Sequence, residues 1–258
     1  MAVAAETNTM TTVMTSVPYA FDEGAVKHRL GLITLASDET TERDFRNMLP
    51  EGAAYYTSRV LSDPSVTIET LREIGPRLAH AAETILPGSR LDSIAYSCTS
   101  GTVALGYDEV AAQVNRGRPG VPVVTPITSA IKALELMGAR KITLFTPYLD
   151  SVNQAMRGFL EDHGIAVLNI GGFGLESDTD MARLPPEAIR AAAVASCHPD
   201  ADALFISCTA IRAVEILEAA EADLGKPVLS AIQTLFWESL RLSGYDKPVE
   251  KFGSLLRA

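Results

Sequence analysis

The chain has 258 residues, a formal net charge of −10 at pH 7, and a composition that is 47% hydrophobic. This length can bury one large α/β core or two smaller ones that share an interface. The acidic charge repels phosphate backbones and anionic lipid, and no apolar run reaches the roughly 20 residues of a membrane span. Composition therefore argues against a nucleic-acid partner and a membrane partner, and it leaves small anionic ligands open because helix N-termini can bind them.

Cysteine usage and the start of the chain bear on its location. The three cysteines, Cys98, Cys197 and Cys208, lack CxxC or Cys/His metal spacing. Such a sparse, odd set predicts neither a disulfide framework nor a zinc site, and it fits a cytoplasmic protein. Residues 1–27 lack the basic and apolar regions of a secretory signal, so we expect a loosely ordered N-terminal arm there.

Strand-like and helix-like runs alternate along the rest of the chain. The patterns predict strands at residues 29–36, 53–60, 93–98, 121–125, 141–146, 165–170, 203–208 and 228–232. They predict helices at residues 69–86, 102–115, 127–138, 151–163, 186–196 and 209–224. This βαβα order is typical of an α/β protein with parallel sheets.

The two halves of the chain share one sequence offset. Cys208 lies 110 positions after Cys98, and the same offset carries Ala36, at the end of the first strand, onto Thr146 at the end of the fifth. Two landmarks with one offset indicate a duplication. We therefore expect two pseudo-symmetric α/β domains, residues 28–126 and 127–232, with the C-terminal segment 233–258 packing back on the first.

The tripeptide Ser-Cys-Thr occurs twice, with its cysteines at Cys98 and Cys208, each at the end of an apolar strand-like run. Ligands of open parallel sheets bind beyond the carboxyl ends of the strands. If a helix starts after each tripeptide, its free N–H groups and partial positive charge lower the thiol pKa and attract a carboxylate. The backbone N–H groups after each cysteine, with the hydroxyls of Thr99, Ser100 and Thr209, are the predicted carboxylate ligands.

Two thiols that face one carbon from opposite sides can act as a base and an acid. A thiolate on one face removes an α-proton, and the thiol on the other face returns one, so the centre inverts without a cofactor. A lone cysteine at a strand end is more often a buried apolar filler. Two cysteines at matched positions, each followed by threonine, favour function instead, whereas Cys197 has no such context.

Other residues add to this site or argue against other chemistries. Tyr148 closes the strand that contains Thr146, where its hydroxyl can hold a carboxylate, and the offset of 110 relates it to Asp38. Asp38 is either a ligand or a helix N-cap. The four histidines fall outside the strand ends, and no GxGxxG or P-loop occurs, so we expect no Cys-His hydrolase, no nucleotide cofactor and no metal.

Several short segments together carry a family resemblance. They are Gly31-Leu32-Ile33, Thr41-Glu42-Arg43-Asp44-Phe45, Tyr96-Ser97-Cys98-Thr99-Ser100, Thr146-Pro147-Tyr148, Asp180-Met181-Ala182-Arg183 and Leu204-Phe205-Ile206-Ser207-Cys208-Thr209-Ala210. They resemble the aspartate/glutamate racemase superfamily, and more closely its maleate cis-trans isomerase and arylmalonate decarboxylase branch. Within that branch the chain looks most like the ectoine-utilisation (EutA) proteins.

The resemblance implies two Rossmann-like (flavodoxin-like) domains, each with a four-stranded parallel sheet, and a cofactor-independent active site in the cleft between them. Decarboxylases of the branch keep only the second cysteine, and racemases and isomerases keep both, as this chain does. In maleate isomerases a thiolate adds to the double bond, and two asparagines with a tyrosine hold the carboxylates. Their positions fall on Asp38, Asp178 and Tyr148, with Thr209 and Ala210 in the second cysteine turn.

The two aspartates depart from that pattern, because an asparagine amide donates to a carboxylate and an ionised aspartate does not. We therefore expect an isomerase or racemase that acts on a small amino-bearing carboxylate, such as a diamino acid derivative from ectoine breakdown. The alternatives are a maleate cis-trans isomerase proper, a decarboxylase that uses Cys208 alone, and a binding protein that keeps the cleft without turnover. A homo-oligomer, a dimer or larger, is the expected assembly.

Overall fold

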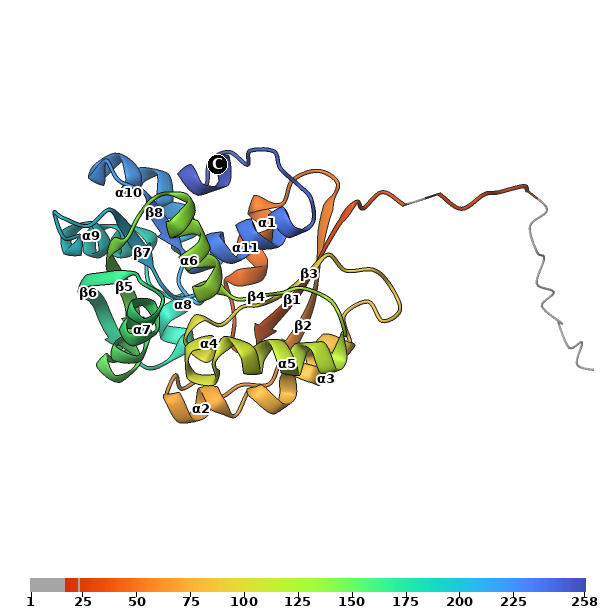
Figure 1. Ribbon diagram of the computed structural model, residues 1–258, viewed down its shortest axis with the longest axis horizontal. Helices are drawn as coiled ribbons and strands as arrows, with labels where there is room; N and C mark the ends of the chain where they lie inside the picture. Colours follow the sequence, from red (N-terminus) through yellow and green to blue (C-terminus); the bar gives the residue numbers. More distant parts are fainter. Residues whose placement is uncertain (1–16, 23) are drawn as a thin grey trace, which may run out of the picture.

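The computed structural model describes residues 17–22 and 24–258, and its strands form two parallel sheets (Figure 1). The first sheet has the order β2-β1-β3-β4 and the second the order β6-β5-β7-β8. The strands are β1 (His28–Leu35), β2 (Ala53–Val60), β3 (Ser93–Tyr96), β4 (Val123–Val124), β5 (Lys141–Tyr148), β6 (Ala166–Leu175), β7 (Ala203–Ile206) and β8 (Val228–Ser230). Two four-stranded sheets with one strand order confirm the predicted pseudo-symmetric α/β fold.

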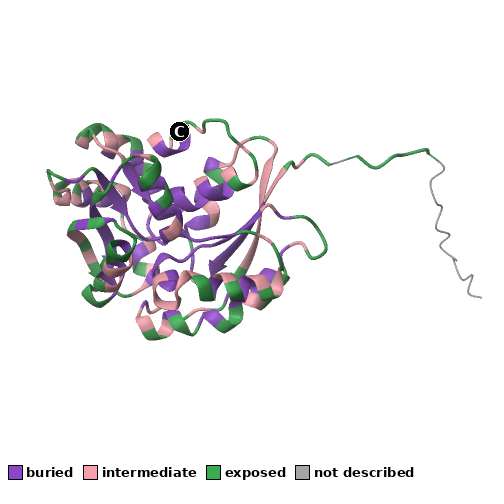
Figure 2. Cartoon of the chain, in the orientation of Figure 1, coloured by how far each residue is buried: buried purple, intermediate pink, exposed green. Residues whose placement is uncertain are grey.

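Helices cover both faces of each sheet. The α-helices are α1 (Thr41–Met48), α2 (Ile68–Arg72), α3 (Leu78–Glu83), α4 (Thr99–Leu105), α5 (Tyr107–Gly117), α6 (Pro126–Leu136), α7 (Asp150–Asp162), α8 (Asp178–Ala182), α9 (Pro186–Ser196), α10 (Leu217–Leu224) and α11 (Ala231–Leu242). In Figure 1, α3 and α5 lie on one side of the first sheet, and α1 and α11 lie on the other. The central strands are buried, the edge strands β2 and β6 are only partly buried, and the outward helix faces are exposed (Figure 2).

The chain leaves the two central strands in the same way. The N–H of Ser97, after β3, donates to the carbonyl of Ile33 at 2.8 Å, and the N–H of Ser207, after β7, donates to the carbonyl of Phe145 at 2.7 Å. Each bond ties the chain to the neighbouring strand just before a cysteine. The duplication thus holds at the residues that matter for the site.

Three of the predicted helices differ from the observed ones. The predicted helix 69–86 is broken by a 3₁₀ turn, Gly75–Arg77, where Pro76 has no N–H to donate. The predicted helix 102–115 is broken at Gly106, whose φ of +86° is left-handed, so that α4 and α5 are separate. The predicted helix 209–224 starts only at a 3₁₀ turn, Val214–Ile216, before α10.

The last predicted strand, 228–232, is too long, because Ser230 ends it by capping α11. Its side chain accepts a hydrogen bond from the N–H of Gln233, and the Gln233 side-chain oxygen accepts one from the N–H of Ser230, which is a capping box. Helix α11 then packs on the first sheet, where Phe236 meets Phe45 edge to face at 5.1 Å. The predicted domain boundaries at 126 and 232 stay a prediction.

The described part of the N-terminal segment extends away from the body (Figure 1). Val17 is 70% exposed and Phe21 is 93% exposed. The rest of the predicted arm, residues 1–16 and 23, lies outside the described residues. No helix in the described part of the chain combines the length and the apolar character that crossing a membrane requires.

Replacing Phe236 with alanine tests the packing of α11. The side chain is fully buried, so we expect the substitution to lower the free energy of unfolding by about 3–5 kcal/mol. Leu242→Ala, at the end of the same helix and 46% exposed, is the control and should change it by less than about 1 kcal/mol. Urea denaturation measures both, and equal effects would contradict this assignment of the core.

Candidate active site

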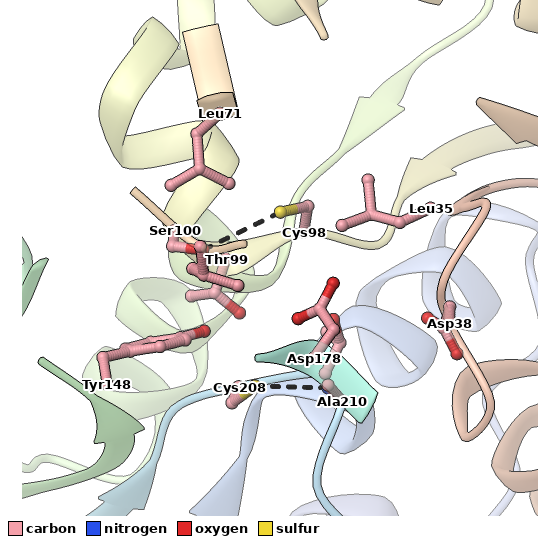
Figure 3. Close-up of a pocket in the computed structure, with 12 residues that line it drawn as sticks. Leu35, Asp38, Leu71, Cys98, Thr99, Ser100, Tyr148, Asp178, Cys208 and Ala210 are labelled. Carbon is pink, nitrogen blue, oxygen red and sulfur yellow. Dashed lines mark hydrogen bonds between the residues drawn. The ribbon is translucent and has the colours of Figure 1, made fainter. Parts of the chain in front are cut away.

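One cavity lies where the carboxyl ends of the two sheets meet, and all nine of the predicted site residues line it (Figure 3). Its walls are Leu35, Asp38, Val66, Leu71, Cys98, Thr99, Ser100, Tyr148, Asp178, Cys208, Thr209 and Ala210. Both sulfurs, both carboxylates and the tyrosine hydroxyl therefore share one space. Cys197 does not line it.

The cavity is closed. Its volume is about 20 Å³, which holds a single water and is far below the roughly 300 Å³ or more of ordinary ligand pockets. Cys98 and Cys208 are 4% and 3% exposed. Part of the wall is apolar, with Leu35 at the end of β1 and Val66 and Leu71 in the segment after β2. A substrate can enter only when a wall moves.

Cys98 caps the N-terminus of α4. Its Sγ accepts a hydrogen bond from the N–H of Gly101 at 3.2 Å, and Ser100 Oγ lies 3.9 Å away. A Cβ on Gly101 would lie 2.7 Å from this sulfur and 2.6 Å from the Tyr96 hydroxyl, so only glycine leaves room for both. The predicted strand-to-helix turn is thus confirmed at Cys98.

Cys208 sits in a different turn. Its Sγ accepts a hydrogen bond from the N–H of Ala210 at 3.2 Å, and residues 209–213 that follow are not helical. The expectation of a helix N-terminus at Cys208 is therefore wrong. The Thr209 hydroxyl instead donates to the carbonyl of Ser97 at 3.1 Å, which joins the two cysteine turns directly.

The expectation that the turns lower the thiol pKa values is also wrong for this closed state. Burial raises the pKa of Cys98 to about 12, the negative charge of Asp178 adds to the rise, and the Gly101 N–H opposes it. Burial raises the pKa of Cys208 as well, and Asp178 again adds to the rise, although the Tyr148 hydroxyl opposes it. Both cysteines are therefore neutral thiols at pH 7 in the absence of a ligand.

Both carboxylate oxygens of Asp38 accept hydrogen bonds from neighbouring residues of the protein. Its Oδ1 accepts hydrogen bonds from the N–H groups of Thr40 and Thr41, both at 2.8 Å, and its Oδ2 accepts the Thr41 hydroxyl. Burial raises its pKa, while these bonds and Arg59 oppose the rise. The carboxylate thus binds the backbone and a hydroxyl of the turn before α1, but the N-cap position of that helix is Thr40 and not Asp38.

Only one carboxylate oxygen of Asp178 accepts a hydrogen bond from the described residues. Ser37 Oγ donates to its Oδ2 at 2.7 Å, and Oδ1 receives no hydrogen bond from the residues that the structure describes. The carboxylate is 6% exposed and projects toward the space between the two cysteines (Figure 3). Burial raises its pKa to about 6, and the Asp38 charge contributes. This group is therefore the open acidic position of the site.

The turn between β1 and α1 holds the three loops of the site together. Ser37 bonds Asp178, the Thr40 hydroxyl donates to the carbonyl of Thr209, and the Thr41 hydroxyl lies 2.8 Å from Ser97 Oγ. Asp38 fixes Thr40 and Thr41 in turn. One five-residue turn thus sets the positions of both cysteine turns and of the open carboxylate.

The remaining polar groups suit a small polar ligand. Thr99 Oγ1 is buried and has no hydrogen-bond partner among the described residues. The Tyr148 hydroxyl lies beside Cys208 and Ser100. No lysine, arginine or histidine belongs to the described wall. Within the described part of the chain, no three His, Cys, Asp or Glu side chains are grouped to hold a metal ion.

Some residues of the site carried no usable sequence signal. Tyr96 was part of the quoted motif, but only the fold places its hydroxyl against Cys98. Ser37 is adjacent to Asp38, yet its partner Asp178 lies 141 positions away. Val66 and Leu71 come from a segment with no polar motif at all. Long-range proximity of this kind is not visible in single-chain periodicity.

Comparison with known proteins agrees with this fold. A family model described as arylmalonate decarboxylase matches residues 55–256. An arylmalonate decarboxylase of Bordetella bronchiseptica is 28% identical over 170 residues, which cover 64% of this chain and 70% of that protein. A maleate isomerase of Alcaligenes faecalis is 24% identical over 244 residues, which cover 89% and 96%.

Solved structures give the same result. The maleate isomerase Iso from Pseudomonas putida S16 aligns with a TM-score of 0.82 at 22% identity, over 90% of this chain and 98% of that one. A mutant of the Nocardia farcinica maleate cis-trans isomerase with a covalently bound succinylcysteine intermediate aligns with a TM-score of 0.82 at 23% identity, over 89% and 98%. At these identities the structural likeness shows a common fold.

The raised pKa of Asp178 predicts a pH-dependent effect on stability. The pKa is about 6 in the folded protein and near 3.8 in the unfolded chain, so ionisation costs the wild type stability as pH rises from about 4 to 6. Asp178→Asn removes that cost. The variant should therefore be more stable than the wild type at pH 7, by on the order of 3 kcal/mol, and nearly equal to it below pH 4.

Urea denaturation at pH 4 and pH 7 measures this difference. Asp44, whose pKa burial also raises to about 6, is present in both proteins and cancels in the comparison. Asp180→Asn is the matched control, because Asp180 lies on the same helix and is exposed. A pH-independent difference between Asp178→Asn and the wild type would contradict the assigned pKa.

Proposed function

Since this chain belongs to the arylmalonate decarboxylase family, we propose that it is a cofactor-independent isomerase or racemase of a small amino-bearing carboxylate, with Cys98 and Cys208 as its acid and base. The observation that carries the proposal is that two thiols, one from each sheet, line a single buried cavity that also contains an open carboxylate. A binding protein without turnover has no need for two matched thiols on one ligand.

The reaction follows from the facing thiols. One cysteine, as a thiolate, takes the α-proton into a new S–H bond, and the electron pair of the C–H bond moves into an enediolate. The other thiol gives its proton to the opposite face of that carbon, so the two cysteines exchange protonation states. The N–H groups of the cysteine turns and the hydroxyls of Thr99, Ser100 and Tyr148 stabilise the enediolate oxygens, whereas the Thr209 hydroxyl is already donated to the carbonyl of Ser97.

Thiolate addition is the second route by which the same groups can act. The Nocardia maleate cis-trans isomerase forms a succinylcysteine intermediate, in which a sulfur–carbon bond replaces a carbon–carbon double bond. For this chain, that route requires an unsaturated substrate. A maleate isomerase proper is therefore the alternative within the same active site.

The amino group of the substrate is argued from charge. Asp38 and Asp178 line the cavity where the resemblance places two amide side chains, and no cationic side chain belongs to the described wall. A dianion such as maleate would meet two carboxylates there and no positive charge. An amino acid brings its own ammonium. A diamino acid derivative from ectoine breakdown meets this requirement, and it is the substrate class that the resemblance of the sequence segments to EutA proteins implies.

A decarboxylase that uses Cys208 alone is a second candidate, supported by the matching family model and by the Bordetella relative. Such an enzyme protonates one face of an enediolate and needs no base on the other. Cys98 faces the same cavity, and its Sγ accepts the N–H of Gly101. A one-cysteine decarboxylase would give this residue no role. The proposed partners otherwise remain a small carboxylate and further copies of this chain, in the cytoplasm.

Substrate preference separates these candidates. We expect the protein to exchange the α-hydrogen of D- or L-2,4-diaminobutyrate or its N-acetyl derivatives in deuterated water, without release of CO2. Turnover of maleate should be slower by at least about 100-fold, since repulsion of one buried charge costs roughly 3 kcal/mol. Rapid maleate isomerisation with no exchange on any amino acid would overturn the amino-bearing substrate.

Cysteine variants test the two-thiol mechanism. Cys98→Ser and Cys208→Ser should each reduce racemisation or exchange by about 10²–10⁴-fold, because serine is a poor acid–base catalyst at neutral pH. Assays from each enantiomer then assign a face to each sulfur. Cys197→Ser is the matched control and should keep full activity. Full activity in Cys98→Ser, with loss only in Cys208→Ser, would favour the one-cysteine decarboxylase.

A further inference from the structure

We propose that Asp178 is the counter-charge for the substrate's ammonium group, and that a cysteine of the site loses its proton only when that ammonium is in place. The inference rests on the proposed function and deepens it, since it names one residue that both recognises the substrate and switches on the thiols. Of the two aspartates in the cavity, it selects one.

The choice of Asp178 follows from hydrogen bonding. The Asp38 carboxylate is occupied by two N–H groups and a hydroxyl of its own turn, so it has little capacity for a ligand. Asp178 has one bonded oxygen and one with no partner among the described residues, and it is more than nine-tenths buried. The residue as a whole is buried, so a carboxylate oxygen that receives no donor from the described residues is available to a donor of a bound ligand.

A second, independent group belongs to the same cavity. Thr99 lines the cavity, and its buried Oγ1 has no hydrogen-bond partner in the described part of the chain. A hydroxyl at the start of α4, beside the free N–H groups of that turn, suits a carboxylate oxygen. The cavity thus offers an acceptor at Asp178 and a donor at Thr99. An α-amino acid carries the matching ammonium and carboxylate on one carbon.

The charges around Asp178 explain the switch. The groups that face it are Cys98 and Tyr96 on the β3 side, Cys208 after β7, and Asp38 in the β1–α1 turn, with Arg59 behind Asp38. Glu176 and Asp180 in its own segment are exposed. None of the groups facing Asp178 directly is a cation, so its negative charge acts on both thiols without compensation.

That negative charge raises the pKa of both cysteines, in addition to the effect of burial. A bound ammonium cancels the charge of Asp178 and adds its own attraction for a thiolate. When the substrate binds, one S–H bond therefore breaks and its proton leaves to solvent. The resulting thiolate then removes the α-proton as described above, and no external oxidant or reductant is needed. A dicarboxylate without an amino group has the opposite effect.

Alkylation rates without substrate test whether the charge of Asp178 suppresses thiolate formation in the unliganded site. In a Cys197→Ser background, iodoacetamide labelling at pH 8, followed by peptide mass spectrometry, reports Cys98 and Cys208 separately. Asp178→Asn should label at least one of them about tenfold faster, which corresponds to one unit in the thiol pKa. Asp180→Asn removes the same net charge from an exposed site and should label at the wild-type rate.

The ligand half is tested by proton release. Calorimetry of the wild type in two buffers of different ionisation enthalpy should show net proton release when 2,4-diaminobutyrate binds, and none with succinate, which has the carboxylates but no ammonium. Equal labelling of Asp178→Asn and wild type, or equal labelling of both variants, would overturn the switch. Binding of 2,4-diaminobutyrate without proton release would overturn it too. Failure of the proposed function alone would appear differently, as no α-hydrogen exchange despite faster labelling of Asp178→Asn.

Discussion

Burial of two thiols and two carboxylates around a space of about 20 Å³ is the constraint on which the rest of this site depends. In such surroundings each negative charge raises the free energy of the next, and no cationic side chain in the described wall compensates. Asp38 is tolerated because its own turn solvates it with three donors. Asp178 lacks that help, and its charge adds to the burial that keeps both thiols protonated. The unliganded site is consequently inert, and reactivity depends on what enters it.

The duplicated architecture supplies two thiols but makes them inequivalent. Both cysteines follow a central strand and both sulfurs accept one backbone N–H, at 3.2 Å in each case. Cys98 then begins a helix, whereas Cys208 begins an irregular loop that is tied to Ser97 and Thr40 of the first half. The two faces of a substrate carbon thus meet different dipoles and different neighbours. Such a difference allows one thiol to rest as the base and the other as the acid.

Whether a feature of the fold or the site could be predicted from the sequence depended on how far apart in the chain the interacting residues lie. The strands, the parallel sheets, the cysteines at two strand ends and Tyr148 at the end of the fifth strand were predictable because strand periodicity and a repeated tripeptide are local signals. The predicted helix ends were wrong where a single residue sets the end of a helix, as Gly106 does for α4. The fate of each aspartate was not predictable, because it depends on partners in space: Ser37 reaches Asp178 across 141 positions. The predicted lowering of the thiol pKa values was wrong for the same reason, because burial raises each pKa more than the N–H groups of the turn lower it.

The exchange of amide side chains for aspartates has a thermodynamic consequence for specificity. An amide at the position of Asp178 would donate to a substrate carboxylate and leave the thiols without an added negative charge. An aspartate forgoes that donor and disfavours the thiolate in the empty site, so part of the binding energy of an ammonium is used to ionise a cysteine. Interactions that act on the reactive form in this way raise the rate and not only the affinity. They also withhold the thiolate, the form that electrophiles and oxidants attack, until a matching ligand is bound. In the proposed mechanism, recognition and reactivity are therefore set by one carboxylate.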